Sequence, residues 1–227
     1  MVKIGIIGAM QHEMDILREN LDHIQTVKIA GFAFWIGKIN EHEVVLCQSG
    51  VGKVNAGIAS SLMIAEFECN LVINTGICGG RGLKKRDVII ARDVRYYDVD
   101  VSAFGYEIGQ IPGMPKAFVP SMESTIMVKS VLNRLGIDYK NVPIYSGDQF
   151  VLSIDQVKRI EPEDVFACEM EGAGVAQSCT KAGVEFIILR YVSDCIGEKD
   201  QKDDYNKFEQ DMSERSANVC LQIINNL

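Results

Sequence analysis

Three acidic residues of this 227-residue chain, Glu13, Glu171 and Asp194, each follow a short apolar run that predicts a buried strand. In open α/β sheets, ligands bind in the crevice beyond the carboxyl ends of the strands. Carboxyl groups gathered at that edge can divide the work of a general acid and a general base. The positions of these residues therefore predict acid-catalysed chemistry on a small polar ligand.

Glycine and aromatic residues follow the predicted strands as well. Residues 74–80 read NTGICGG and residues 146–150 read SGDQF. Glycine lets a ligand approach the backbone closely, and Phe150 offers a ring face for stacking. Each acid, taken alone, has an alternative role as a helix cap. The coincidence of three acids with Arg190 favours one shared site over three separate caps.

The elements that must position these side chains are predicted from the alternation of short apolar runs with longer amphipathic stretches. This alternation favours an α/β fold with a largely parallel, buried sheet, to which an early hairpin adds antiparallel pairing. The predicted strands are residues 2–7, 32–39, 43–48, 71–74, 87–92, 142–146, 165–167 and 184–191. The predicted helices are residues 11–20, 53–68, 123–135, 171–182 and 205–225.

No repeat or linker interrupts this pattern, which predicts one domain over residues 1–227. Residues 102–121 are the least regular stretch, and they hold three of the five prolines. A loop of that length in a compact domain is more often functional than idle. We therefore expect this loop to contribute to function.

Composition excludes several classes of protein. The formal net charge is −8 and no run of Lys or Arg occurs, which argues against a nucleic-acid-binding surface. The seven cysteines are odd in number and never form a CxxC spacing, so neither a disulfide framework nor a metal site is expected. No segment approaches the roughly 20 apolar residues of a transmembrane span. We expect a cytoplasmic protein without a membrane partner.

The glycine-rich stretch at residues 50–57 fails the nucleotide-binding patterns that it first suggests. A Walker A loop would need glycine at Cys47 and Ser or Thr at Val54, and a dinucleotide fingerprint would need glycine at Asn55. The stretch instead predicts a tight turn that opens a helix, whose N-terminal N–H groups face a ligand or solvent. The three histidines share no metal-site spacing, and no GxSxG motif of a serine hydrolase is present.

Several short motifs occur in an order that resembles the nucleosidases of the nucleoside phosphorylase/hydrolase family. They are GIIGAM at residues 5–10, SGVGKVNA at 49–56, NTG at 74–76, DVSAFGY at 100–106, SGDQF at 146–150, EMEG at 169–172 and SD at 193–194. The resemblance implies a single three-layer αβα domain with a mixed, mostly parallel central sheet. It also implies a homodimer that needs no cofactor or metal. Its substrates would be adenine nucleosides (5′-methylthioadenosine, S-adenosylhomocysteine and 5′-deoxyadenosine), whose N-glycosidic bond it hydrolyses to release adenine.

The resemblance also implies roles for individual residues. Glu13 matches the general base that activates the attacking water, and Asp194 matches the general acid that protonates adenine at N7. Glu171 matches the acid that binds the ribose hydroxyls, with Met170 beneath the sugar. Phe150 matches the aromatic residue that stacks on adenine.

Other matched positions surround these residues. The backbone of Val151 would read the adenine edge, and Arg190 and Ser193 would support the acids. The pocket wall would include Met10, Val51 and Gly79. A partner subunit would lend three residues to the pocket for the 5′-alkylthio group, namely Val101, Phe104 and Pro112.

Two positions depart from the family pattern. Ile77 stands where many nucleosidases have a serine whose hydroxyl helps to hold the catalytic aspartate, so Asp194 is expected to be held by backbone groups or by Ser193. Residues 195–204 are unusually polar and one residue longer than expected, which places Tyr205 rather than phenylalanine in the pocket. These departures leave open which 5′ substituent is preferred. They do not change the reaction that the resemblance implies.

The implied reaction makes demands on the acids. Adenine is a poor leaving group as an anion, so protonation at N7 stabilises its departure and positive charge develops on the sugar. For Asp194 to act as an acid near neutral pH, burial or neighbouring carboxylates must raise its pKa. Glu13 and Glu171 are the expected source of that like charge.

Three alternatives stay open at this point. A nucleoside phosphorylase of the same fold would need cationic groups for phosphate, whereas this chain has Met10, Glu13 and Asn74 at the corresponding positions. A hydrolase of 6-amino-6-deoxyfutalosine is a closer alternative, which the sequence does not exclude. A non-catalytic nucleoside-binding protein would be expected to lack one of the three acids, and all three are present.

Overall fold

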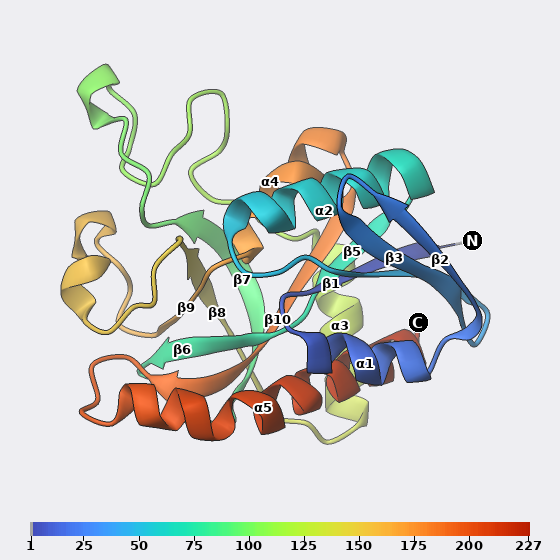
Figure 1. Ribbon diagram of the computed structural model, residues 1–227. Helices are drawn as coiled ribbons and strands as arrows, with labels where there is room; N and C mark the ends of the chain where they lie inside the picture. Colours follow the sequence, from blue (N-terminus) through green and yellow to red (C-terminus); the bar gives the residue numbers. More distant parts are fainter. Residues whose placement is uncertain (1) are drawn as a thin grey trace.

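A mixed sheet of ten strands runs through the molecule (Figure 1). The computed structural model describes residues 2–227. The strands are β1 (Lys3–Gly8), β2 (Asp22–Ile29), β3 (Phe32–Ile39), β4 (His42–Gln48), β5 (Leu71–Asn74), β6 (Ile77–Arg81), β7 (Val88–Tyr96), β8 (Tyr139–Ser146), β9 (Phe166–Glu169) and β10 (Glu185–Cys195). Their order is β2-β3-β4-β1-β5-β10-β6-β9-β8-β7, and β7 also pairs with β10, so the second half of the sheet closes on itself.

Helices cover both faces of this sheet. They are α1 (Gln11–Glu19), α2 (Lys53–Phe67), α3 (Met122–Arg134), α4 (Gly172–Ala182) and α5 (Gln201–Ile224). In Figure 1, α2 and α4 lie on one side of the sheet, and α1, α3 and α5 lie on the other. Successive side chains of β1 supply both layers, because Ile7 belongs to the core with α2 and α4, and Ile6 to the core with α1 and α5. The predicted three-layer αβα architecture is confirmed.

The N-terminal ends of α2 and α4 approach each other closely. A Cβ atom on Gly174 would lie 2.3 Å from the carbonyl oxygen of Lys53, so only glycine fits there without a shift of the backbone. This contact places the first turns of both helices side by side at the edge of the sheet. It matters for the site, because Glu171 is the N-cap residue of α4.

The pairing of the strands agrees in most respects with the pairing that the sequence predicts. β1 pairs in parallel with β4 and β5, and β5 pairs in parallel with β10. The predicted hairpin of β3 and β4 is present. The sequence pattern does not predict β2, because its residues are largely exposed and show no apolar alternation. It also misses β6, a five-residue strand that contains two glycines.

Two element boundaries differ from the predictions in ways that affect the site. β10 continues to Cys195 because, after its pairing with β5 ends at Ile188, it pairs with β6. Ser193 and Asp194 therefore lie inside a strand rather than after one. α5 begins at Gln201 instead of Tyr205, since the polar residues of its first turn carry no apolar pattern that would predict a helix.

Residues 102–121 form the long irregular connection that the sequence predicts. A 3₁₀ turn at Ser102–Phe104 and a single bridge between Val94 and Phe118 are its regular features. Two more 3₁₀ turns, Ile154–Gln156 and Lys158–Ile160, follow β8. Between residues 2 and 227, no helix has both the length and the apolar character needed to cross a membrane.

Candidate active site

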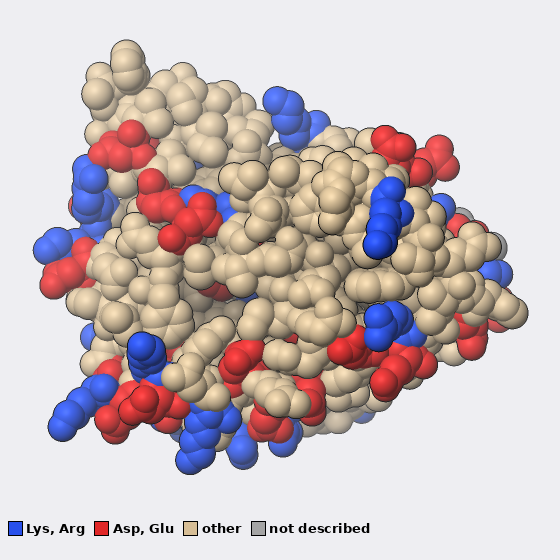
Figure 2. Space-filling model, in the orientation of Figure 1, with Lys and Arg blue, Asp and Glu red and all other residues tan. Residues whose placement is uncertain are grey.

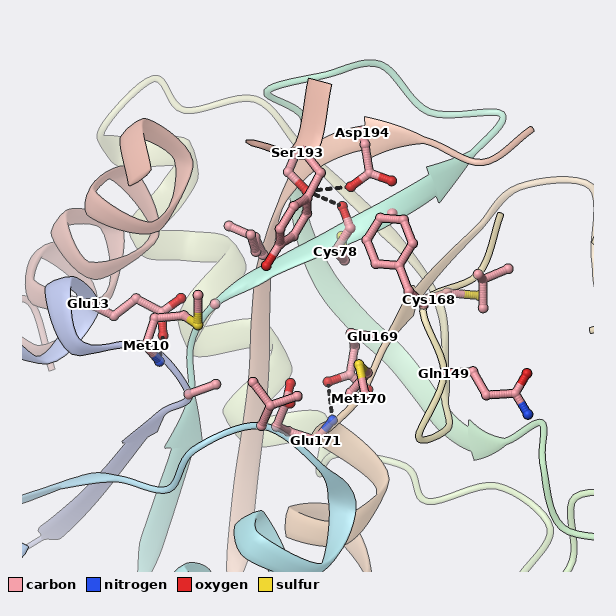
Figure 3. Close-up of a pocket in the computed structure, with 18 of the residues that line it drawn as sticks. Met10, Glu13, Cys78, Gln149, Cys168, Glu169, Met170, Glu171, Ser193 and Asp194 are labelled. Atoms are coloured by element: carbon pink, nitrogen blue, oxygen red, sulfur yellow. Dashed lines mark hydrogen bonds between the residues drawn. The ribbon is translucent and has the colours of Figure 1, made fainter. Parts of the chain in front are cut away.

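A pocket opens at the edge of the sheet where β1, β5, β9 and β10 meet the helices and loops that follow them (Figure 3). In Figure 3, Ser193 and Asp194 lie at one end of the pocket, Met170 and Glu171 lie at the other, and Glu13 lies to the side. Most residues predicted to form a site line this pocket: Met10, Glu13, Val51, Ile77, Gly79, Phe150, Val151, Met170, Glu171, Ser193, Asp194 and Tyr205.

Glu13 lies in the first turn of α1 and is buried. One of its oxygens, Oε2, accepts a hydrogen bond of 3.2 Å from the backbone N–H of Met10. Burial raises the pKa of Glu13 to about 7, although this hydrogen bond and the charge of Arg190 act in the opposite direction. A Cβ atom on Gly8 would lie 2.8 Å from Oε2, so glycine leaves the room that this carboxyl group occupies. Glu13 thus caps the N-terminus of α1 and also lines the pocket.

Glu171 lies two residues after β9, at the start of α4. Its Oε1 accepts a hydrogen bond of 3.0 Å from the backbone N–H of Gly52, and its Oε2 lies 3.8 Å from Nη2 of Arg190. Burial and the negative charge of Glu169 raise the pKa of Glu171 to about 7. Glu13 and Glu171 are therefore two carboxyl groups that bind or release a proton near neutral pH.

The N-terminus of α2 does not face a ligand or solvent as the sequence predicts. The N–H group of Gly52 donates to Glu171, and the N–H group of Lys53 donates to Oδ1 of Asp148 at 2.9 Å. These protein carboxylates satisfy donors that the first turn of a helix leaves free. The prediction is wrong in this respect, because it placed neither α4 nor the loop after β8, which carries Asp148, beside α2.

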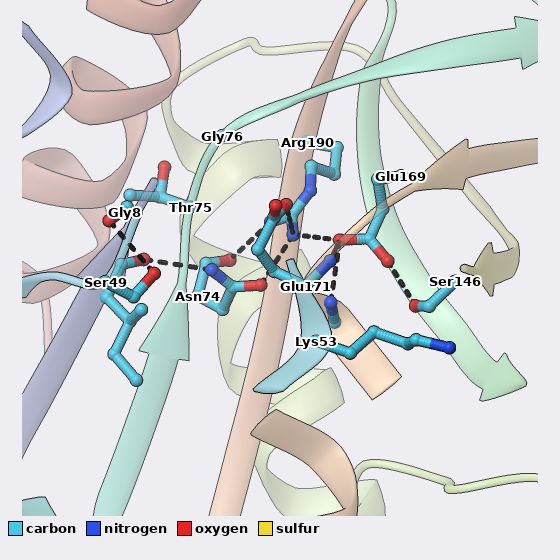
Figure 4. A network of polar contacts seen from close by, with 12 residues as sticks. Gly8, Ser49, Lys53, Asn74, Thr75, Gly76, Ser146, Glu169, Glu171 and Arg190 are labelled. Atoms are coloured by element: carbon cyan, nitrogen blue, oxygen red, sulfur yellow. Dashed lines mark hydrogen bonds and ion pairs between the residues drawn. The ribbon is translucent and has the colours of Figure 1, made fainter. Parts of the chain in front are cut away.

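A network of hydrogen-bonded polar side chains supports the pocket from behind (Figure 4). Arg190 is 1% exposed and donates from Nη2 to Glu169 and, at 2.6 Å, to Oδ1 of Asn74. Glu169 also accepts hydrogen bonds from the Ser146 hydroxyl and from the N–H group of Glu171. Arg190 does not line the pocket, so it holds the acids rather than reaching a ligand.

Asp194 is buried in β10, beside a register shift in its pairing with β6. Its Oδ1 lies 2.6 Å from the hydroxyl of Ser193, and its Oδ2 accepts a hydrogen bond of 2.7 Å from Nε2 of Gln201. Burial raises the pKa of Asp194, while both hydrogen bonds lower it. The main like charge that acts on this group is that of Asp204, rather than those of Glu13 and Glu171 as expected. The cause is position, because Asp194 lies at the other end of the pocket from Glu171.

Among the residues that sequence reasoning missed, two form hydrogen bonds or ion pairs with the charged groups of this site. Gln201 belongs to the polar stretch that the sequence marked as unusual, but nothing in its type predicted a contact with Asp194. Glu169 lines the pocket and pairs with Arg190, and it stands two residues before Glu171 in the same motif. The short EMEG motif was the available signal for Glu169, since two acids so close together in a buried segment need a partner cation.

Aromatic and apolar side chains form the rest of the wall. The rings of Phe150 and Tyr205 meet edge to face, with centroids 5.2 Å apart and an interplanar angle of 80°. Phe150 comes from the loop after β8, and Tyr205 from the second turn of α5. The pocket therefore has an aromatic side next to Asp194 and a carboxylate side next to Arg190.

The three loop residues predicted to reach a partner do not line the pocket of their own chain. Phe104 is 80% exposed, and it lies with Val101 and Pro112 in the segment between β7 and α3. This connection projects away from the sheet in Figure 1. Within residues 2–227, no group of three or more His, Cys, Asp or Glu side chains is arranged to hold a metal ion.

Comparison with known proteins places the chain among enzymes that act on nucleosides. It matches the model of the Phosphorylase superfamily over residues 3–225. It is similar to the 5′-methylthioadenosine/S-adenosylhomocysteine nucleosidase of Staphylococcus haemolyticus (strain JCSC1435), with 45% identity over 201 residues that cover 86% of this chain and 88% of the relative.

Two solved structures show the same likeness in three dimensions. The 5′-methylthioadenosine/S-adenosylhomocysteine nucleosidase of Neisseria meningitidis, in complex with methylthio-immucillin-A, has a TM-score of 0.94 and 34% identity over 100% of both chains. A futalosine hydrolase mutant of Helicobacter pylori strain 26695 has a TM-score of 0.93 and 30% identity, again over 100% of both chains.

Proposed function

Since this chain belongs to the phosphorylase superfamily, and within it to the 5′-methylthioadenosine/S-adenosylhomocysteine nucleosidases, we propose that it is an N-glycosyl hydrolase of these two nucleosides and of 5′-deoxyadenosine. The products are adenine and the corresponding 5-substituted ribose. The observation that carries the proposal is the gathering of Glu13, Glu171 and Asp194, all buried, around one pocket.

Asp194 acts on the leaving group. As a neutral acid it donates a proton to N7 of adenine, so the base departs as a neutral molecule rather than as an anion. Burial favours this neutral form, because a charged carboxylate loses hydration when it is enclosed. Phe150 stacks on the adenine ring, and the backbone of Val151 binds its edge.

Glu13 acts on the nucleophile. With a pKa of about 7, it is partly ionised at neutral pH and can accept a proton from the attacking water. Its negative charge also stabilises the positive charge that develops on the sugar as the glycosidic bond breaks. Glu171 binds the ribose hydroxyls and holds C1′ near that water, with Met170 beneath the ring.

The electrostatics of the pocket favour water over phosphate as the attacking group. No Lys or Arg side chain lines the pocket in the described part of the chain, and Arg190 behind it is paired with Glu169. A phosphate dianion next to Glu13 and Glu171 would meet two carboxylates without a compensating cation. This arrangement supports hydrolysis rather than phosphorolysis.

A second substrate deserves a direct comparison. The likeness to a futalosine hydrolase of Helicobacter pylori makes 6-amino-6-deoxyfutalosine a candidate nucleoside for the same site. The ratio of kcat/KM for this nucleoside and for 5′-methylthioadenosine measures the preference. We expect 5′-methylthioadenosine to be preferred, and a higher kcat/KM for the futalosine derivative would reverse the assignment.

We also propose a homodimer in which Val101, Phe104 and Pro112 complete the 5′ end of the partner's pocket. The surface over α2 and α4 supports this, because Val54 is 70% exposed there and the face is largely uncharged, whereas charged side chains gather along α5 at the lower edge of the view (Figure 2). We also propose that residues 1–227 form one domain, that the protein is located in the cytoplasm, and that it acts in methionine salvage. Sedimentation of the purified protein tests the dimer.

Mass spectrometry of the sugar product tests the reaction itself. We expect free 5-methylthioribose when 5′-methylthioadenosine is cleaved in a buffer that contains phosphate. A 5-methylthioribose 1-phosphate product would show phosphorolysis and overturn the hydrolase assignment.

A further inference from the structure

The first residue of α5, Gln201, carries a buried amide group. It lies at the end of the pocket formed by Ser193 and Asp194, which the proposed function assigns to adenine (the adenine end). Its side chain is 2% exposed and lies behind Asp194. The turn that precedes it carries Gly197, whose N–H group donates to Oε1 of Gln201 at 3.0 Å. The oxygen of this amide is thus fixed by a backbone donor.

The nitrogen of the same amide joins two separate parts of the site. Nε2 donates to the carbonyl oxygen of Val151 at 2.8 Å and to Oδ2 of Asp194 at 2.7 Å. Both partners of Nε2 accept hydrogen bonds, and the partner of Oε1 donates one, so the amide has a single orientation that satisfies all three. Towards Asp194, Gln201 can only donate.

This constraint distinguishes the two oxygens of Asp194. Oδ2 already accepts a hydrogen bond from Gln201, so it is the poorer place for the carboxyl proton. Oδ1 faces the hydroxyl of Ser193, which can donate or accept, and that hydroxyl also lies 3.2 Å from the carbonyl oxygen of Cys78. When Oδ1 is protonated, it can donate to Ser193 while Ser193 donates to Cys78.

We propose that Gln201 is a positioning residue of the proposed hydrolysis, which holds Oδ2 of Asp194 as an acceptor and leaves Oδ1 as the oxygen that carries the transferable proton. The inference rests on the role of Asp194 in the proposed function. It also explains how the acid is held without a hydroxyl at Ile77, which lines the same pocket and offers no hydrogen bond. Through Val151, the same amide ties the acid to the backbone segment that binds adenine.

Several other groups act on Asp194 and must be kept unchanged in a test. Asp204 raises its pKa, and Lys85, which pairs with Asp204, lowers it. Asp194 in turn raises the pKa of four titratable neighbours, Cys78, Cys168, Cys195 and Tyr205. None of these residues is altered in the variants below.

The Gln201→Met variant keeps the length of the side chain and removes its donors. We expect kcat to fall by about 10- to 100-fold with little change in KM, because the acid is misplaced but the ribose end of the pocket is intact. The carboxyl carbon of Asp194, followed by ¹³C NMR and assigned with Asp194→Asn, is expected to titrate at higher pH than in the wild type. The control is Lys202→Met, an exposed neighbour on the same helix, which is expected to match the wild type in both measurements.

The Gln201→Glu variant keeps the shape and makes the donor depend on pH. A protonated glutamic acid can still donate to Oδ2, whereas its carboxylate repels Asp194. Activity relative to the wild type is therefore expected to recover as the pH falls. A merely structural role would produce no such recovery.

Three results would overturn the proposal. The first is an unchanged kcat and an unchanged titration of Asp194 in Gln201→Met. The second is a lower KM in that variant, which would show that Gln201 competes with adenine. The third is that the activity of Gln201→Glu does not recover at low pH. Failure of the proposed function is a different result. The wild type would then release no adenine from any of these nucleosides, while the NMR titration would still report on the contact.

Discussion

The two ends of the pocket hold their acids by different means. In the part of the pocket that the proposed function assigns to the ribose and the attacking water (the ribose end), Glu13 and Glu171 accept hydrogen bonds from backbone N–H groups, and Arg190 lies 3.8 Å from Glu171. At the adenine end, Asp194 is held by the side chains of Ser193 and Gln201. Backbone donors come with the fold, whereas side-chain donors depend on single residues. The adenine end is therefore where this chain can depart from its relatives without losing the architecture.

Removal of the acid at the adenine end is expected to have the largest effect. Asp194→Asn keeps the size of the side chain and one acceptor oxygen but cannot protonate the leaving group. We expect adenine release to fall by about 10⁴-fold, the upper range for a positioned acid. Nucleoside binding, measured by calorimetry, should remain. An active Asn variant would contradict the assignment of the acid.

Removal of the shared cation is expected to affect stability most. Arg190→Met leaves the buried carboxylate of Glu169 without its partner cation, which should lower the free energy of unfolding by about 3–5 kcal/mol. Urea unfolding measures this loss. The matched control is Arg215→Met, whose ion pair with Asp211 is exposed and should contribute at most about 1 kcal/mol. An equal loss in both variants would mean that Arg190 is no more important than a surface residue.

Removal of the base at the ribose end is expected to be milder than removal of the acid. Glu13→Gln should lower kcat/KM by about 10²-fold, because water and the developing sugar cation remain partly stabilised by Glu171. In the wild type, kcat/KM should fall as the pH drops below about 7, the pKa to which burial raises Glu13, since only the ionised form accepts a proton. The variant should lack that limb of the pH profile. A retained limb would assign it to another group.

The ribose end should also leave a signature in stability. The pKa of Glu171 is raised by burial to about 7 from 4.5, so the folded protein binds the proton more tightly than the unfolded chain does. The resulting decrease in the free energy of unfolding is absent below pH 4.5, grows as the pH rises, and is complete above about pH 7. The free energy of unfolding of Glu171→Gln should therefore rise, relative to that of the wild type, by on the order of 2 kcal/mol between pH 4.5 and pH 8. A constant difference between the two proteins would contradict this.

The smallest effect is expected at the aromatic side of the pocket. Tyr205→Phe keeps the edge-to-face contact with Phe150 and removes one hydroxyl, which should change kcat/KM for 5′-methylthioadenosine by no more than about fivefold. Comparison of 5′-methylthioadenosine with S-adenosylhomocysteine would show whether the hydroxyl acts on the 5′ substituent. A loss of about 100-fold would instead indicate that Tyr205 takes part in the chemistry.

The same contrast explains what could be predicted from the sequence. The apolar runs of β1, β5 and β10 and the helices between them are visible as patterns, and the acids that follow β1 and β9 are found from them. β2 is invisible because its exposed residues carry no alternation. The ribose end was therefore predictable, except that α2 and α4 meet there, a contact that depends on Gly174.

The adenine end was predictable only in part. Asp194 was found, but its position inside β10 depends on pairing with β6, a strand that its glycines conceal. The role of Gln201 depends on how the turn before α5 folds, and a polar residue in a polar stretch gives no sign of burial. The long-range contacts of single side chains were the part that sequence patterns could not provide.

The central claim is that this pocket cleaves an N-glycosidic bond with water. The most direct test is the rate of adenine release from 5′-methylthioadenosine by the purified protein in phosphate-free buffer. We expect full activity there, with no increase when phosphate is added. Adenine release that requires phosphate, or no release at all from this nucleoside, would contradict it.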